Sequence, residues 1–299
     1  MKTAVVFSGQ GSQFVGMGQE LYDLYPECKK IFDASGDVKD WCFNGPKELL
    51  TQTKYTQPAL FTASVAGWIA LKSNNVKVDA VAGFSLGEYA ALVAADVISF
   101  EDCLALVIKR GQWMEEAVPS GGGMAAVLGS DDQTLKEAMI HSGAQAVNFN
   151  APGQVVIVGM NDELKKATEF LKEKRVKVIP LSVSGPFHSS FMEDVSSKIK
   201  DELYSIAINK PQIPIMSNVT GEYYQCDKMA ELISIQVKSP VLWENTIRRL
   251  IADGVDTFIE VGAGKTLCGL IKKIDNTVKT FYVQDKLTLD GMLAEVERW

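Results

Sequence analysis

Ser85 is the residue of this chain whose neighbours most clearly indicate chemistry. It is the central residue of Gly-Phe-Ser-Leu-Gly at 83–87, between a run at 78–83 that is typical of a strand and an apolar run at 86–95 that is typical of a helix. In so sharp a strand-to-helix turn, small residues two positions on either side of the serine relieve crowding, and the start of the helix offers N–H groups to an oxyanion. The segment predicts a nucleophile elbow and an enzyme that attacks an acyl carbon.

A nucleophilic serine needs a base, and histidine is the usual one because its free pKa lies near neutrality. The chain has two histidines. His141 lies near the end of a predicted helix, where a solvent-facing histidine is stabilised by the helix dipole. His188 lies in a segment of small residues and proline at the junction of two predicted units, where ligand clefts form. We therefore expect His188 to be the base.

The group that orients the imidazole is less evident. The chain has 37 acidic residues, and none beside either motif stands out. A main-chain carbonyl or an amide side chain could accept from the distal ring N–H instead. A serine–histidine dyad is therefore an alternative to a full triad.

Arg110 is a cation within an otherwise apolar helical segment. It could extend to the surface or pair with Glu115 or Glu116. It could also grip a substrate carboxylate through two parallel hydrogen bonds. Hydrophobic periodicity does not decide between these interpretations.

Two glycine-rich turns, at 9–14 and 262–266, resemble phosphate-binding loops but do not complete either nucleotide motif. Phe14 replaces the third glycine of one pattern, and Ile259 replaces the first glycine of the other. Both turns follow predicted strands, so we expect them to border the same cleft as the elbow.

Strands and helices alternate along most of the chain, which predicts an α/β fold with a mainly parallel sheet covered by helices. A cap at Ser99 opens one helix, and Ser239 with Pro240 is expected to open another. The expected elements are strands at 3–7, 80–83, 213–216 and 257–261, and helices at 58–72, 99–118, 190–206 and beyond Gly264.

The rhythm changes to β-α-β-β-α-β between 121 and 185, which is the order of a ferredoxin-like unit. We therefore expect this unit as a subdomain at 121–185, inserted into a catalytic core formed by 1–120 and 186–299.

Composition narrows the classes of function. The net charge is -7 and no block of like charge is long enough for a nucleic-acid arm, so nucleic acid is not an expected partner. No secretory segment and no membrane span are recognised, and the five scattered cysteines disfavour both disulfides and a zinc site. We expect a cytoplasmic protein without a bound metal.

Several motifs together carry a family resemblance. They are the segments 9–13, 83–88, 110–111, 148–154 and 185–189. In this order they resemble the malonyl-CoA:acyl-carrier-protein transacylases, which supply malonyl units to fatty-acid synthesis, and the resemblance extends to 261–265. It implies an α/β-hydrolase-like core with the ferredoxin-like insert. It also implies malonyl-CoA as substrate, an acyl carrier protein as partner, no cofactor and a monomer.

The resemblance also implies roles for the residues. Ser85 would take the malonyl group as an ester while His188 moves the proton, in a ping-pong reaction. The main-chain N–H groups of Gln10 and Leu86 would form the oxyanion hole. Arg110 would pair with the free malonyl carboxylate.

Three further positions follow from the resemblance. Gln236 would orient His188 through its main-chain carbonyl. Phe187 would leave little room for an α-methyl branch, which gives a preference for malonyl groups. Phe84 departs from the family pattern, which has histidine before the nucleophile, and this changes the polar contacts expected near the acyl pocket.

Other functions use the same residues. A serine hydrolase would pass the acyl group to water, a trans-acting acyltransferase would serve a polyketide synthase, and a noncatalytic module would only bind a carrier protein. Intact mass after mixing with malonyl-CoA would separate the noncatalytic module from the enzymes.

Overall fold

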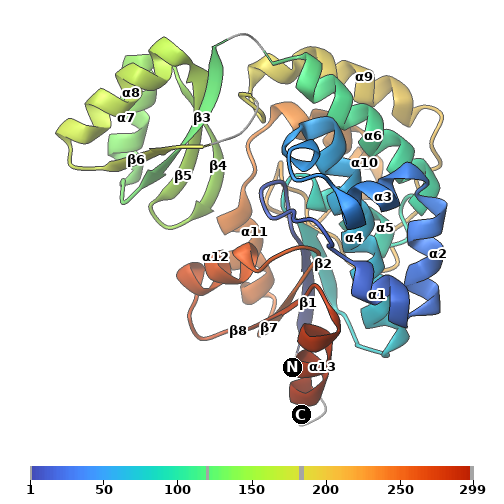
Figure 1. The fold of residues 1–299 in the computed structure, drawn as a ribbon. Helices are drawn as coiled ribbons and strands as arrows, with labels where there is room; N and C mark the ends of the chain where they lie inside the picture. The colour runs from blue at the N-terminus through green and yellow to red at the C-terminus, as the bar shows by residue number, and fades with distance from the viewer. Residues whose placement is uncertain (1, 119–120, 182–184, 297–299) are drawn as a thin grey trace.

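The computed structural model describes residues 2–118, 121–181 and 185–296, and within them it has one parallel and one antiparallel sheet (Figure 1). The parallel sheet has the strand order β2-β1-β7-β8, and the antiparallel sheet has the order β4-β5-β3-β6. The predicted α/β class is confirmed. The strands are β1 (Thr3–Phe7), β2 (Ala80–Gly83), β3 (Gly122–Leu128), β4 (Gln145–Ala151), β5 (Gln154–Met160), β6 (Lys177–Pro180), β7 (Thr257–Val261) and β8 (Lys279–Val283).

Helices cover both faces of the parallel sheet. Those of this part are α1 (Gln19–Leu24), α2 (Pro26–Ala34), α3 (Asp37–Asn44), α4 (Thr53–Ser73), α5 (Gly87–Ala94), α6 (Phe100–Glu116), α9 (Glu193–Leu203), α10 (Met229–Ile235), α11 (Trp243–Ala252), α12 (Thr266–Ile274) and α13 (Lys286–Val296). As predicted, Ser99 caps α6: its hydroxyl accepts from the Asp102 N–H at 3.1 Å. None of the helices in the described ranges is both long and apolar enough to span a membrane.

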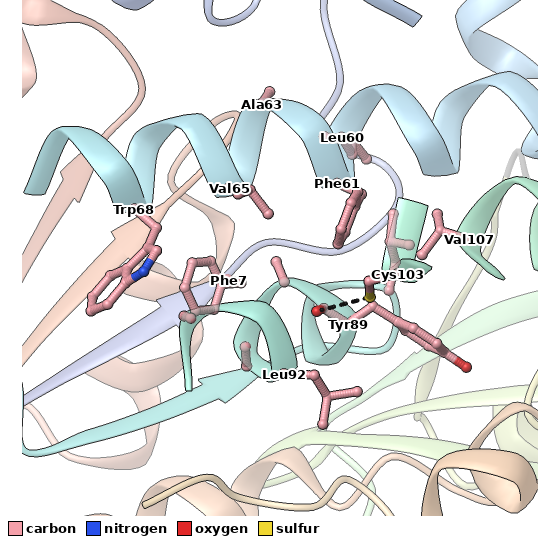
Figure 2. Packing of buried hydrophobic residues seen from close by; sticks show 14 of the residues in the cluster. Phe7, Leu60, Phe61, Ala63, Val65, Trp68, Tyr89, Leu92, Cys103 and Val107 are labelled. Carbon is pink, nitrogen blue, oxygen red and sulfur yellow. Dashed lines mark hydrogen bonds between the residues drawn. The ribbon is translucent and has the colours of Figure 1, made fainter. Parts of the chain in front are cut away.

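The strand β1 lies between β2 and β7 and is buried along its whole length. Val5 and Phe7 contribute to the core on the α4 side, whereas Ala4 and Val6 contribute to the core beneath α11 and α12. Figure 2 shows the first of these cores, where the Phe7 ring meets the Trp68 ring edge to face at 6.4 Å. Because both faces of the strand are covered, every side chain is apolar or small, as in other parallel sheets.

The helix α4 begins earlier than predicted, at Thr53, and includes Pro58. A proline so close to the start removes only one main-chain hydrogen bond of the helix. Almost the whole helix is buried, including the first-turn residues Thr53, Thr56 and Gln57. Burial of this segment outweighs the local preference for starting at the proline.

The antiparallel sheet and two helices form the predicted β-α-β-β-α-β unit, seen in yellow-green beside the parallel sheet in Figure 1. The helices are α7 (Asp132–Ser142) and α8 (Asn161–Glu173). They pack on one face of the sheet around Val127, Leu135 and Leu171. Residues 119–120 and 182–184 adjoin the two predicted boundaries and lie outside the described residues, so the division at 121 and 185 remains a prediction.

The strand predicted at 213–216 is wrong. The segment makes one parallel bridge to the outer edge of β2, in which the Val81 N–H donates to the Pro214 oxygen at 2.9 Å and the Met216 N–H donates to the Val81 oxygen at 3.0 Å. Pro214 has no N–H with which to extend the ladder. The helix predicted at 190–206 is also shorter, because a 3-10 turn at Ser190–Met192 precedes α9.

The helix start predicted at Ser239 and Pro240 is wrong as well. Ser239 ends a 3-10 turn at Gln236–Lys238, and α11 begins only at Trp243. Between them, the Val241 N–H donates to the Val147 oxygen at 2.7 Å. The chain therefore pairs with the edge of β4 before it winds into the helix, which brings the core and the antiparallel sheet together beside His188.

Candidate active site

Ser85 lies at a sharp turn between β2 and α5, in a left-handed main-chain conformation with a φ of 52°. Such a φ is uncommon for residues other than glycine. A Cβ atom added to Gly83 would lie 1.9 Å from the main-chain carbon of Gly87, and one added to Gly87 would lie 2.1 Å from the Phe7 oxygen. Any larger residue at these two positions would push α5 away from the sheet, so the glycines are what allow the turn to form.

The hydroxyl of Ser85 and the ring of His188 are in direct contact, with 2.6 Å between Oγ and Nε2. On the other side of the ring, Nδ1 lies 3.0 Å from the Gln236 carbonyl oxygen and 3.2 Å from that of Ser239. Carbonyl oxygens only accept hydrogen bonds, so Nδ1 carries the proton and Nε2 faces the serine as an acceptor. This is the form of histidine that can take a proton from the hydroxyl.

The ring is held by main-chain carbonyls rather than by an acid. His188 is 3% exposed, and its main-chain N–H donates to the Val237 oxygen at 3.0 Å. His141, in contrast, lies exposed in the last turn of α7, where its ring packs 5.3 Å from that of Phe170. The structure thus brings only one of the two histidines to the serine.

Burial lowers the pKa of His188 from 6.5 to about 4, and the nearby charge of Arg110 adds to this effect. A base must be unprotonated, so we expect kcat/KM for acylation of Ser85 to stay constant from neutral pH to about pH 5 and to fall only below it. The pH dependence of a stopped-flow acylation assay measures this. An acidic limb centred at the pKa of a free histidine would contradict the lowered pKa of His188.

The lowered pKa of His188 also makes the stability of the fold depend on pH. Because the pKa is depressed in the folded state, the unfolded chain binds more protons at this residue between pH 6.5 and 4. The contribution of His188 to the free energy of unfolding is therefore present at neutral pH and is lost as the pH falls through this window.

Arg110 is completely buried on α6. Its Nη1 donates to Gln57 Oε1 at 2.6 Å and its Nη2 donates to Gln236 Oε1 at 3.1 Å, while the guanidinium lies 5.0 Å from the centre of the Tyr89 ring. The surface interpretation is therefore wrong. Pairing with Glu115 is wrong too, because that carboxylate forms its ion pair with Lys54 at 3.2 Å.

The guanidinium is bonded to neutral amides, and its Nε has no hydrogen-bond partner in the described part of the chain. Burial lowers the pKa of Arg110 because the charged form loses its hydration. A buried cation without a bonded carboxylate is a place where an incoming anion gains more than it would at the surface.

A cavity of about 270 Å³ lies beside Ser85 and His188. Both glycine-rich turns border it, as expected, through Gly9, Gly11 and Thr266. Gln57 forms the wall in front of Arg110, whose own side chain does not line the cavity.

The residues predicted for the oxyanion hole, Gln10 and Leu86, both line this cavity. The loop carrying Gln10 reaches the elbow because Gly9 packs tightly on it: an added Cβ would lie 2.6 Å from the Phe84 oxygen. Neither the Gln10 N–H nor the Leu86 N–H donates to another main-chain group among the described residues. Neither N–H is therefore engaged by the main chain of this part of the structure.

Two phenylalanines adjoin the reactive pair. Phe187 is 6% exposed and lines the cavity immediately before His188. Phe84, which precedes the serine, also lines the cavity, and its ring meets the Trp243 ring edge to face at 5.5 Å. An apolar contact thus occupies the position where the resemblance implies a histidine.

Sequence reasoning assigned no role to several polar residues of the site. Asn148 and Asn150 on β4 line the cavity, and their Oδ1 atoms are buried without a hydrogen-bond partner among the described residues. Their alternate spacing places both on one face of the strand, which was a signal that could have found them. Asn218 contacts the elbow from a distant turn, and no local pattern pointed to it.

Among the residues that the structure describes, no three His, Cys, Asp or Glu side chains gather into a group that could hold a metal ion.

A parallel α/β sheet, a serine elbow at the end of β2 and a histidine against the serine define the class of α/β proteins that carry an activated serine. Comparison with known proteins narrows this class. The model of the family described as acyl transferase domain matches residues 4–285. The chain belongs to this acyl transferase family, and it is a transferase.

Relatives and solved structures agree over the whole length. The malonyl CoA-acyl carrier protein transacylase of Bacillus subtilis (strain 168) is 44% identical over 303 residues, which cover 97% of this chain and 95% of the relative. The crystal structure of malonyl CoA-acyl carrier protein transacylase from Clostridium perfringens superposes with a TM-score of 0.96 at 43% identity, covering 100% of this chain and 98% of the other.

A further solved structure shows a type II PKS acyl-carrier protein in complex with its malonyl-transacylase. The matched chain has a TM-score of 0.94 and 36% identity, covering 99% of this chain and 100% of the other. The α/β-hydrolase-like core with a ferredoxin-like insert, which the resemblance implied, is thus confirmed as the fold.

Proposed function

We propose that the protein transfers the malonyl group of malonyl-CoA to the phosphopantetheine thiol of an acyl carrier protein, for fatty-acid biosynthesis. The observation that carries the proposal is the 2.6 Å contact between Ser85 Oγ and His188 Nε2, beside a cavity whose wall includes Gln57, the hydrogen-bond partner of the buried Arg110 guanidinium. The full-length likeness to proteins named for this reaction supports it.

In the first half-reaction, Ser85 Oγ attacks the thioester carbon of malonyl-CoA and its proton passes to His188 Nε2. The N–H groups of Gln10 and Leu86 stabilise the oxyanion, each by about 3 kcal/mol. The carbon–sulfur bond then breaks, and the departing thiolate of CoA takes the proton from His188. A malonyl ester on Ser85 remains.

In the second half-reaction, His188 takes the proton of the carrier-protein thiol, and the sulfur attacks the ester carbon. The same two N–H groups receive the oxyanion. When the bond to Ser85 Oγ breaks, the proton returns from His188 to the serine. Burial keeps the imidazole neutral, and the Gln236 and Ser239 carbonyls fix the tautomer in which Nε2 is free to accept. This is the form required at the start of both halves.

Arg110 is proposed to bind the free carboxylate of the malonyl group. Its amide partner Gln57 lines the cavity, so a carboxylate that displaces this amide reaches the guanidinium directly. The exchange replaces a neutral acceptor by a charged one, which makes a stronger hydrogen bond.

The arm of the thiol substrate is proposed to run between the two units of the fold, the core at 1–120 and 186–299 and the subdomain at 121–185. Asn148 and Asn150 line the cavity from β4, and their Oδ1 atoms have no hydrogen-bond partner in the described part of the chain. A pantetheine arm carries amide N–H groups that can satisfy such oxygens. The subdomain would thus supply binding, and the core would supply the reacting groups.

Phe187 is proposed to select malonyl over branched acyl groups. In Phe187→Ala we expect the ratio of kcat/KM for methylmalonyl-CoA to that for malonyl-CoA to rise by about tenfold to a hundredfold, because one methyl group in an apolar pocket is worth about 1–3 kcal/mol. Measuring both substrates on the same variant cancels any loss of folded protein. An unchanged ratio would remove Phe187 from the selectivity account.

A second candidate is a malonyl acyltransferase that serves a polyketide synthase. The solved complex of a malonyl-transacylase with a type II PKS acyl-carrier protein favours it. The chemistry at Ser85 is the same, and only the carrier protein differs. Rates with purified fatty-acid and polyketide carrier proteins in parallel would distinguish the two, and we expect the fatty-acid carrier to react faster.

The proposal is tested by following radiolabelled malonyl-CoA with and without a carrier protein bearing its pantetheine arm. We expect label on the carrier protein at a rate far above the release of free malonate. Faster release of malonate would identify a serine hydrolase, and the absence of both products would leave only a noncatalytic binding module.

A further inference from the structure

Asn218 holds the main chain of the elbow from outside the cavity. Its Oδ1 accepts from the Ser85 N–H at 2.8 Å, and its Nδ2 donates to the Gly83 oxygen at 2.7 Å. One amide thus clamps a main-chain donor and a main-chain acceptor on either side of Phe84. The residue is completely buried and does not line the cavity.

Asn218 is itself fixed by hydrogen bonds. Its N–H donates to Glu88 Oε2 at 2.7 Å, and its carbonyl accepts from the Leu242 N–H at 2.9 Å. The other oxygen of Glu88 accepts from the hydroxyl of Tyr224, and both residues are buried. The carboxylate lies on α5, one turn beyond the serine, so the amide, the acid and the phenol form a support connected to the helix that the elbow opens.

The opposite side of Ser85 is held by a second amide. Gln236 Nε2 donates to the Ser85 oxygen at 2.7 Å. That carbonyl and the Leu86 N–H belong to one planar peptide group, so holding the oxygen also sets the direction of the N–H. Together, Asn218 and Gln236 hold the two peptide groups that flank the serine.

The left-handed conformation of Ser85 needs such support. A non-glycine residue in this region of φ and ψ persists only where its surroundings over-determine it. Here the conformation directs Oγ to His188, and the next residue, Leu86, lines the cavity. A small rotation of this segment would lengthen the contact to His188 and misalign the oxyanion donor together.

We infer that Asn218 is a positioning residue for acyl transfer, which keeps Ser85 and the Leu86 N–H in the geometry of reaction without contacting the substrate. This inference rests on the proposed function for the identity of the acyl group. The effect of Asn218 on the reactivity of Ser85 is inferred without the proposed function, and a fluorophosphonate probe reports that reactivity separately.

The test compares Asn218→Ala with Asn74→Ala in the full-length protein. Asn74 provides a matched control because its Nδ2 also donates to a main-chain oxygen, that of Ala70 at 2.8 Å, at the end of α4. For Asn218→Ala we expect kcat for malonyl transfer to fall about a hundredfold, as misplacement of reacting groups produces, with KM for malonyl-CoA changed less than about twofold. Acylation of Ser85 and transfer to the carrier thiol should slow alike, and Asn74→Ala should behave as the unchanged protein.

Labelling of Ser85 by a fluorophosphonate should slow to a similar extent in Asn218→Ala. If malonyl transfer is absent in the unchanged protein but this labelling still depends on Asn218, the proposed function fails and the inference stands. If malonyl transfer is present and both kcat and the labelling rate survive in the variant, the inference fails and the proposed function stands.

Asn218→Asp keeps the shape and the oxygen that faces the Ser85 N–H, but it replaces the donor to Gly83. Asn218→Asp replaces Asn218→Ala in the test if the alanine variant does not fold, which circular dichroism and the unfolding midpoint would show. We expect a folded Asn218→Asp protein with kcat lowered at least tenfold and KM unchanged. A folded protein with unchanged kcat, or one that loses activity only through KM, would overturn the positioning role.

Discussion

His188→Ala is expected to lower kcat for malonyl transfer by about a thousandfold, in the range that removal of a general acid–base produces. The ring nitrogen that lies 2.6 Å from Ser85 Oγ is lost, and the described contacts offer no second imidazole to the serine. Both half-reactions should slow, because the same nitrogen takes the proton from the serine and from the thiol. Single-turnover acylation and transfer measured separately would show this.

The control is His141→Ala, which removes the other histidine from the exposed end of α7. We expect its kcat and KM to match those of the unchanged protein. Unfolding midpoints of both variants would show whether lost activity reflects lost folding. A folded His188→Ala protein that retains more than about a tenth of the rate would contradict the role of the ring as base.

Arg110→Ala is expected to lower kcat/KM for malonyl-CoA by at least about a hundredfold relative to its effect on acetyl-CoA. Each charge-assisted hydrogen bond is worth about 1.5–3 kcal/mol, and a carboxylate can accept two of them from the guanidinium. Acetyl-CoA presents no second carboxylate, so it does not use this contribution. Initial rates with both acyl-CoA substrates on the same preparation provide the comparison.

Arg110 also bonds to Gln57 and Gln236, so its removal affects the fold near the site. The acetyl rate measures that general loss, and the ratio isolates recognition of the carboxylate. Arg110→Lys keeps the charge but not the planar fork, and we expect it to recover only part of the malonyl rate. Equal losses for both substrates would remove Arg110 from carboxylate binding.

Local patterns predicted the parts of the molecule that depend on local geometry. Glycines at 83 and 87 indicate the elbow because no other residue fits beside α5 and β1. The alternation of strands and helices likewise predicted the parallel sheet, and the β-α-β-β-α-β order predicted the antiparallel one. These features depend on neighbours in the sequence or on a fixed period, and such constraints are visible without the fold.

Contacts between distant segments could not be read in this way. The strand predicted at 213–216 is reduced to one parallel bridge on β2, because Pro214 has no N–H with which to extend the ladder. The helix predicted from Ser239 begins later, because Val241 first pairs with β4. Burial of Arg110 was equally undecided, because periodicity does not show which face of α6 meets Gln57 and Gln236. The role of Asn218 depends on a contact across 133 residues, which no pattern near Ser85 announces.

The fate of the malonyl group at Ser85 tests most directly whether the protein transfers it through a serine ester. The unchanged protein is mixed with malonyl-CoA, its intact mass is recorded, and the modified residue is mapped by peptide fragmentation before and after a carrier protein with a free pantetheine thiol is added. We expect one malonyl group per chain, carried on Ser85 and absent from Ser85→Ala, that moves to the carrier thiol when the carrier protein is added. A chain that never gains the malonyl group, or that carries it on another residue, would contradict transfer through Ser85.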